Sequence, residues 1–357
     1  MRCNETEPWR RPLGFLLDLW ILPVTCVVGL VLNIACLFVF SNRRSHPLVP
    51  ALMVLSLCDS LQLLISLFVL FIPALHDHME MDPYGSVAQL AYLSTGALAG
   101  GLLTSNCAAI WTMCYISIQR HRAIVSPLST VNDQKRSTTW PLFVIFLCSL
   151  LFNVPVWFEF TWSVDQVQRE DGEITQILWH TNSQFAQAPI YRLIMRQILY
   201  PIVVYVIPLF LISILNMRIL SHISASRAAV KTVGSRKHIA REQRSIWLLI
   251  SIVVVFFLCH TGQFEAPRKV QLIVDVVGGL VIRFIDQRKY ENQPCFVFAK
   301  DFINFLFNIN SFVDPMLYFF FTKQFKDLRT TWASNKNSNS VTQRLLRRLS
   351  SRASTTK

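Results

Sequence analysis

The sequence predicts an all-α membrane protein, a bundle of seven membrane-spanning helices followed by a short amphipathic helix. Hydrophobic residues make up 52% of the 357 positions and charged residues only 15%, which is typical of a polytopic membrane protein. About 20 apolar residues cross a bilayer as a helix. The apolar stretches of this sequence are longer and more numerous than the buried helices of a soluble protein would be. The seven apolar stretches cover residues 16–41, 49–75, 90–118, 140–162, 193–220, 245–262 and 297–321.

The basic residues predict the orientation of the chain. Alternate connections hold 22 of the 34 Lys and Arg residues but only three of the acids. The positive-inside rule therefore places these connections in the cytoplasm and the N-terminus outside, in a multi-pass protein of the plasma membrane. Because the basic bias is topological, the expected partner of these segments is anionic lipid and not nucleic acid. The cytoplasmic segments are 41–48, 119–139, 218–244 and 322–357.

The spans divide the chain into three parts. Residues 1–15 form the extracellular N-terminus, and 16–321 form the membrane domain. Residues 322–357 contain the short amphipathic helix and a cytoplasmic tail rich in Ser, Thr and Arg. Ser350 and Ser351 follow two arginines in this tail, a pattern that basophilic kinases recognise. We expect phosphorylation there to reverse the local charge and to recruit a desensitising partner, a kinase or an arrestin.

An excess of residues separates the sixth and seventh spans. From Gly262 to Pro315 there are 53 residues, about 18 more than the roughly 35 that the bilayer thickness requires. Residues 263–278 place Glu265 and Arg268 where an apolar outer half of the sixth span is expected. The sequence therefore predicts that 263–278 is an insertion between the sixth span and the third external loop, or a retained intron.

Several motifs in the spans carry a resemblance to a known family. The seventh span contains NSFVDPMLY at 310–318, and the third ends in QRHRAIVSPL at 119–128. Asn33 lies in the first span, Asp59 in the second and Pro208 in the fifth. Polar groups and prolines in lipid are costly and mark functional positions. In order and spacing these residues resemble the rhodopsin-like (class A) G-protein-coupled receptors, with their (Asn/Asp)-Pro-x-x-Tyr and Asp-Arg-Tyr motifs.

Two shorter runs resemble a narrower group. LFNVPVWFEF at 151–160 and VYVIPL at 204–209 are similar to the FMRFamide-type neuropeptide receptors of invertebrates, particularly nematodes. The resemblance implies a receptor, not an enzyme, that couples an extracellular RF-amide-like peptide to a heterotrimeric G protein. A chemosensory receptor for a small molecule is the alternative within the class. A transporter or channel would need charged residues along a continuous path, whereas the embedded acids are Asp59 and Asp314.

A polar cluster is expected in the middle of the bundle. Asp59, Ser105, Asn310, Ser311 and Asp314 fall at similar depths in the second, third and seventh spans. Two ionised carboxylates there would repel each other without a cation. Because oxygen ligands suit a hard cation, the cluster predicts a bound sodium ion on Asp59 that rearranges on activation, as the resemblance implies. The alternative is a static hydrogen-bonded network in which one carboxyl is protonated.

The resemblance also implies an activation switch toward the cytoplasm. Arg120 ends the third span and Glu242 begins the sixth, so the two form a candidate latch that opens when the sixth helix moves. The alternative is a pair of snorkelling surface charges. His260, Pro315 and Tyr318 stand at the family's switch positions in the sixth and seventh spans. His260 replaces the usual Trp, which makes the details of activation different from those of well-studied receptors.

Acids near the outer mouth are candidate contacts for a cationic peptide. Glu159, Asp286 and Asp301 lie at the outer ends of predicted spans or in the external loops, and further acids lie at 77–82 in the first external loop. An RF-amide peptide is cationic, so opposite charge would steer and hold it. The alternative for the loop acids is ordinary solvated surface charge.

External cysteines depart from the family pattern. The usual disulfide joins the outer end of the third span to the second external loop, but Thr95 occupies the first position and 163–190 contains no cysteine. Cys3 and Cys295 are the two external thiols, and an oxidising environment predicts a bridge between them. Asn4 begins an Asn-x-Thr sequon in the external N-terminus, which predicts glycosylation.

Overall fold

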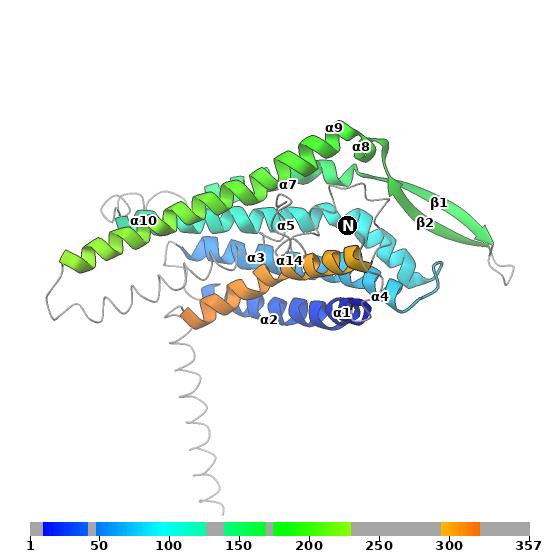
Figure 1. Ribbon diagram of the computed structural model, residues 1–357, viewed down its shortest axis with the longest axis horizontal. Helices are drawn as coiled ribbons and strands as arrows, with labels where there is room; N and C mark the ends of the chain where they lie inside the picture. Colours follow the sequence, from blue (N-terminus) through cyan, green and yellow to red (C-terminus); the bar gives the residue numbers. More distant parts are fainter. Residues whose placement is uncertain (1–9, 42–47, 126–138, 169–173, 230–293, 322–357) are drawn as a thin grey trace, which may run out of the picture.

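The computed structural model describes residues 10–41, 48–125, 139–168, 174–229 and 294–321 (Figure 1). In these ranges long helices lie side by side as a bundle, and six of the seven predicted spans are helical. The sixth span at 245–262, the insertion at 263–278 and the amphipathic helix after residue 321 lie outside the described residues. Five helices of the described part are long and apolar enough to cross a membrane.

The first three spans are longer than predicted. The first consists of α1 (Arg10–Leu16), the π-helical η1 (Leu17–Ile21) and α2 (Leu22–Ser41). The second consists of α3 (Val49–Ser66), η2 (Leu67–Phe71) and α4 (Ile72–His78). The third is the single helix α5 (Ser86–Val125).

The fourth, fifth and seventh spans complete the described bundle. The fourth is α7 (Thr139–Trp157). The fifth consists of η3 (Arg192–Leu199), η4 (Ile202–Val206) and α10 (Ile207–Ala229). The seventh is α14 (Pro294–Phe321), with Pro315 inside it. π-Helical segments such as η1, η2 and η3 are frequent near functional sites.

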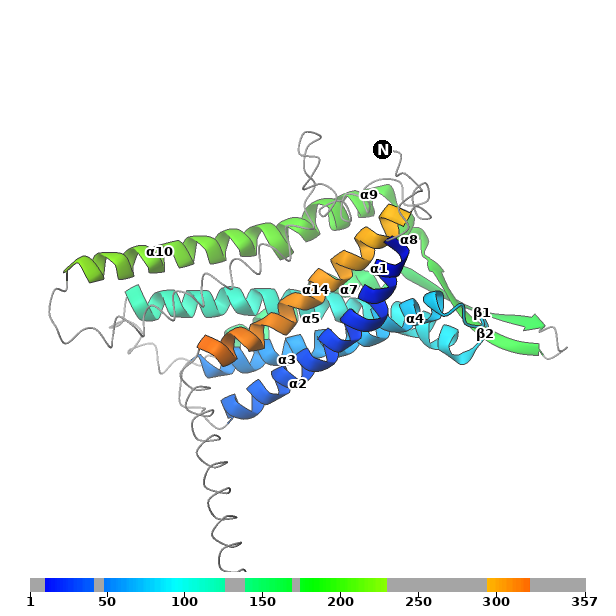
Figure 2. The same cartoon turned by 60° about the horizontal axis from the view of Figure 1, so that its bottom comes forward.

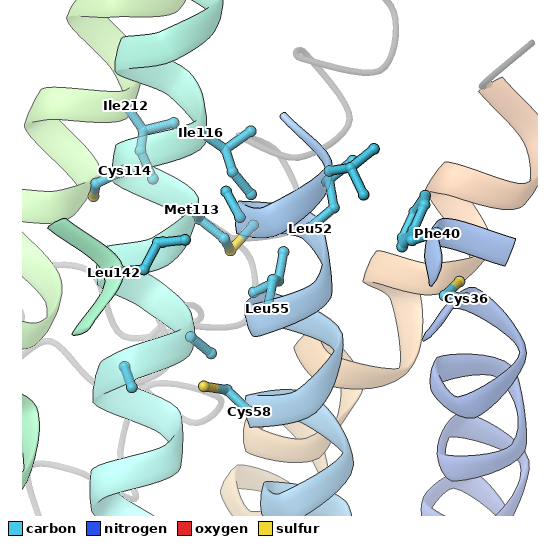
Figure 3. Packing of buried hydrophobic residues seen from close by; sticks show 14 residues of the cluster. Cys36, Phe40, Leu52, Leu55, Cys58, Met113, Cys114, Ile116, Leu142 and Ile212 are labelled. Atoms are coloured by element: carbon cyan, nitrogen blue, oxygen red, sulfur yellow. The ribbon is translucent and has the colours of Figure 1, made fainter. Parts of the chain in front are cut away.

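The centre of the bundle is built around α5, which packs against α3, α7 and α10. Fourteen buried apolar residues fill the space between these helices and α2; Phe40, Leu55, Met113 and Ile212 are among them (Figure 3). Large apolar side chains cover the outside as well, for example Phe38 at 71% exposed. An apolar exterior of this kind fits lipid, because polar groups are excluded from the hydrocarbon region.

A β-hairpin follows α7, and it corrects the predicted fourth span. That span was expected to reach residue 162, but the helix ends at Trp157 and the strand β1 (Phe160–Gln168) pairs antiparallel with β2 (Ile174–Asn182). The prediction was wrong because hydropathy does not separate an apolar strand from a helix end. β-Branched and aromatic residues alternate with polar ones after residue 159, a strand pattern.

The hairpin defines one end of the bundle. It projects beyond the same end at which α1 and α14 begin and α4 ends (Figures 1 and 2). We call this the outer end, following the orientation predicted from the basic residues. After β2, Ser183 caps the short helix α8 (Gln184–Gln187) by accepting a hydrogen bond from the Ala186 N–H at 3.2 Å. The helix α9 (Pro189–Tyr191) then leads into η3.

Candidate functional site

Two buried amide side chains attach α14 to the neighbouring helices. Asn33 of α2 donates from Nδ2 to the carbonyl oxygens of Gly29 and Ser311, both at 3.0 Å. Gln62 of α3 donates from Nε2 to the carbonyl oxygen of Phe307 at 3.0 Å. Both donors bind backbone of the seventh span across helix interfaces, so they set the depth of α14 relative to α2 and α3.

The predicted polar cluster forms between α3 and α14. Asp59 is fully buried, and it lies close enough to Asp314 and Ser311 of α14 to feel their electrostatic effect, although neither makes a hydrogen bond to it. Asn310 is buried on the same helix as Asp314. Ser105 is buried on α5, where its hydroxyl donates to carbonyl oxygens of its own helix at 2.9 and 3.0 Å. The structure thus brings Asp59, Ser311 and Asp314 together. The Ser105 hydroxyl is instead hydrogen-bonded to the backbone of its own helix, α5.

Acceptor oxygens dominate the unpaired atoms around this cluster. Among the described residues, both carboxylate oxygens of Asp59 and Oδ2 of Asp314 are buried without a hydrogen-bond partner. Buried polar atoms normally have one, from protein or from water. Other buried side-chain oxygens of α2, α3 and α14 also lack a hydrogen-bond partner: Asn33 Oδ1, Gln62 Oε1, Ser66 Oγ, Asn308 Oδ1, Asn310 Oδ1 and Ser311 Oγ.

This set of oxygens suits a hard cation with water. Sodium, like calcium and magnesium, takes carboxylate, amide and hydroxyl oxygens as ligands. No group of three His, Cys, Asp or Glu residues that could hold a metal ion occurs in the described part of the chain. Gln62, Ser66 and Asn308 were missed by the sequence analysis, although polar residues inside apolar spans were the available signal.

The predicted activation switch is only partly within the described residues. Arg120 is half-buried near the end of α5, and the preceding Gln119 donates from Nε2 to the Tyr115 hydroxyl at 2.7 Å. Pro315 is buried inside α14. Glu242 and His260 lie outside the described residues, as does the side chain of Tyr318. The predicted latch between Arg120 and Glu242 therefore stays a prediction.

Glu159 forms a buried ion pair at the outer end. Its side chain is 5% exposed and pairs with the guanidinium of Arg196, which donates to both carboxylate oxygens. The Tyr191 hydroxyl donates to Glu159 Oε1 at 2.8 Å. Burial and this carboxylate raise the pKa of Tyr191, so the phenol remains a proton donor. Glu159 was expected to contact ligand, yet its charge is already balanced by a cation 37 positions along the chain.

The other predicted outer residues are less completely described. Asp301 belongs to α14 and Cys295 to its first turn, but their side chains lie outside the described residues. Asp286, Cys3, Asn4, Ser350 and Ser351 lie outside them entirely. Their roles stay predictions. The described cysteines are all free thiols on spans: Cys26, Cys36, Cys58, Cys107, Cys114 and Cys148.

An aromatic group joins the hairpin to α5. The His180 ring of β2 lies 4.9 Å from the Phe160 ring and 5.8 Å from the Trp162 ring of β1. The His180 ring also lies 5.6 Å from the Tyr92 ring of α5. Burial among these rings lowers the pKa of His180, although a hydrogen bond to the Tyr92 backbone acts in the opposite direction. The histidine is therefore held in its neutral form.

We expect acid to loosen this contact. Because the folded-state pKa lies below the ordinary value of about 6.5, neutral His180 contributes stability above that pH, and the contribution is lost as the pH falls through the folded-state pKa. The melting temperature of the purified protein should fall more between about pH 7.5 and about pH 5 than that of His180→Phe, which keeps a ring but does not titrate. Equal falls in both proteins would show that His180 does not carry the effect.

Comparison with known proteins points to one family. A family profile described as "7 transmembrane receptor (rhodopsin family)" matches residues 32–318. An allatostatin-A receptor of Bombyx mori is 24% identical over 224 residues, and a gonadotropin-releasing hormone II receptor of Clarias gariepinus is 23% identical over 235. Each alignment covers 61% of this chain and 54% of the relative. The chain thus spans about half the length of the curated relatives that it matches.

Proposed function

Because the chain belongs to the rhodopsin family of seven-transmembrane receptors, we propose that it couples an extracellular peptide to a heterotrimeric G protein at the plasma membrane. The observation that carries this proposal is the family match over residues 32–318, together with two relatives named as receptors for allatostatin-A and for gonadotropin-releasing hormone II. A receptor of this family is a signalling protein and not an enzyme. The hydrogen bonds from Asn33 and Gln62 attach α14 to α2 and α3, so a movement of the seventh helix would have to break them.

For the ligand we propose an amidated RF-amide-like peptide, on the basis of the runs at 151–160 and 204–209. A cationic peptide needs acids at the outer end. Glu159 already pairs with Arg196, so we assign recognition of the peptide charge to Asp286 and Asp301, near the outer ends of the sixth and seventh spans. A small chemosensory ligand is the competing proposal, and it would not need these acids.

The middle and the cytoplasmic end supply the rest of the proposed mechanism. Asp59, Asp314 and the surrounding oxygens would hold a sodium ion and water in the resting receptor, and this charge compensation lets two carboxylates remain buried together. At the cytoplasmic end, Arg120 would meet the G protein after its release from Glu242. Ser350 and Ser351 would receive the phosphates that end the response and attract arrestin.

A ligand panel tests the proposed function. Cells expressing the full-length receptor with an external epitope are exposed to FMRFamide, other amidated peptides, allatostatin-A, gonadotropin-releasing hormone II and small odorants, while calcium and cAMP are recorded. We expect a response to an amidated peptide. Arg120→Ala is the control, because this variant should reach the surface and stay silent. A response to an odorant with none to any peptide would replace the peptide proposal by the chemosensory one.

A further inference from the structure

The outer half of α5 carries two glycines that are each covered by a tryptophan. Gly96 and Gly100 are four residues apart and therefore share one face of the helix. A Cβ added at Gly96 would lie 2.6 Å from Cη2 and Cζ2 of Trp162 in β1. A Cβ at Gly100 would lie 2.5 Å from Cε2 of Trp157 at the end of α7. Real Cβ atoms do not approach other atoms so closely, so the two indoles fit only against glycine.

Three further contacts connect the same segments. Trp157 donates from Nε1 to the Ala97 carbonyl oxygen at 2.9 Å. The Leu178 N–H of β2 donates to Gln89 Oε1 of α5 at 2.8 Å. The ring of Trp179, also in β2, lies 5.2 Å from the Tyr92 ring. Together these contacts join α5 to the end of α7 and to both strands of the hairpin.

We name this set of contacts the aromatic clasp. It consists of indoles and hydrogen bonds from α7, β1 and β2 on one side and of the glycine-bearing face of α5 on the other. Its members are Gln89, Tyr92, Gly96, Ala97, Gly100, Trp157, Trp162, Leu178, Trp179 and His180.

No covalent bond duplicates the clasp. Residues 86–101 at the start of α5 and 158–190 around the hairpin contain no cysteine. We propose that the aromatic clasp is the positioning device that fixes the hairpin on α5, and that it replaces a covalent bridge. The attachment is therefore insensitive to reductants but sensitive to the size of residues 96 and 162.

Hydrogen exchange of the full-length receptor in detergent micelles tests the clasp without any ligand. We expect Gly96→Ala to raise the exchange rates of backbone amides at 160–168 and 174–182 by at least about tenfold, because the new methyl group displaces Trp162 and opens the hairpin locally. Gly101→Ala is the matched control. Its Cβ would meet Ile65 Cδ1 at 3.4 Å, an ordinary contact, and hairpin exchange should stay at the wild-type rate.

A second substitution checks that the effect is steric. Phenylalanine at 162 lacks the outer indole atoms that the new methyl group would meet, so Trp162→Phe in the Gly96→Ala background should recover most of the protection. Trp162→Ala introduces no clash and should by itself raise exchange in the hairpin while leaving α2 and α3 protected. The proposal is overturned if Trp162→Ala leaves hairpin exchange unchanged.

Discussion

Arg196→Met is expected to lower the free energy of unfolding by about 2 kcal/mol. The substitution leaves the Glu159 carboxylate, whose side chain is 5% exposed, buried without its cation. Removing one partner of a fully buried pair costs roughly 3–5 kcal/mol, whereas an exposed pair contributes at most about 1 kcal/mol. The Arg196 side chain is 49% exposed, so the expected cost falls between these ranges. Methionine keeps the apolar stem of the arginine, which isolates the effect of the charge.

Arg192 provides the matched control on the same element. Its guanidinium donates to the Gln187 carbonyl oxygen at 3.1 Å in an exposed setting, and it neutralises no buried acid in any contact described above. Arg192→Met should therefore change stability by less than about 0.5 kcal/mol. The two variants are compared by thermal unfolding of the full-length receptor under identical conditions. Size-exclusion chromatography of heated samples measures how much folded receptor remains at each temperature.

A double substitution separates the buried charge from other effects of the change. Glu159→Gln in the Arg196→Met background removes the uncompensated carboxylate while preserving its shape, so it should recover about half or more of the lost stability. The Tyr191 hydroxyl can still donate to the amide oxygen. The contrary outcome is that the double variant loses as much unfolding free energy as the two single variants lose when their losses are added. In that case the two side chains are not coupled and Arg196 does not hold Glu159.

The ion pair also shows where inference from sequence stops. Sequence reasoning identified Glu159 as an acid at the outer mouth, because it lies at the outer end of the predicted fourth span in a recognisable run. It did not identify Arg196 as its partner, because the two residues are 37 positions apart and their contact depends on how the hairpin returns the chain to the fifth span. The number of acids near a mouth is visible in a sequence, whereas their pairing is a tertiary property.

The spans were predictable for a physical reason. A bilayer requires about 20 apolar residues per crossing, and this requirement acts on each span separately, so six predicted spans coincide with described helices. The fourth span was extended too far because residues 158–162 are apolar enough for a helix, yet 158–159 form a turn and 160–162 begin β1. Gly96 and Gly100 were visible as small residues, but the tryptophans that cover them come from α7 and β1 and could not be assigned without the register of the hairpin.

The polar cluster was predicted from the energetic cost of placing polar side chains in lipid, and not from the relative positions of those side chains. Polar groups in lipid persist where they have a role, which was enough to select Asp59 and Asp314. The direction of each hydrogen bond was not available, because the depth of a residue does not specify which neighbour it faces. Thus Asn33 was recognised as part of the family pattern, while its bond to the Ser311 carbonyl oxygen was found only in the structure.

Sodium chloride is expected to stabilise the receptor relative to choline chloride, and Asp59→Asn is expected to remove the difference. A ligand present at about ten times its dissociation constant stabilises the folded state by about 1.4 kcal/mol, which corresponds to a shift of several degrees or less in melting temperature for a chain of this size. Asp59 is the natural position to remove, because both of its buried oxygens lack a hydrogen-bond partner among the described residues and Asp314 interacts with it.

Asp77→Asn is the control for a change of one carboxylate to an amide. Asp77 lies at the end of α4 with its side chain 76% exposed. Its substitution should therefore leave the stabilisation by sodium intact. A wild-type receptor that melts at the same temperature in both salts would favour the static network, in which a proton on one carboxyl and not a cation relieves the repulsion. The two outcomes differ in mechanism as well as in stability, because a cation held between α3 and α14 must leave or move when these helices separate. Only the cation would make the resting state of the receptor depend on external sodium.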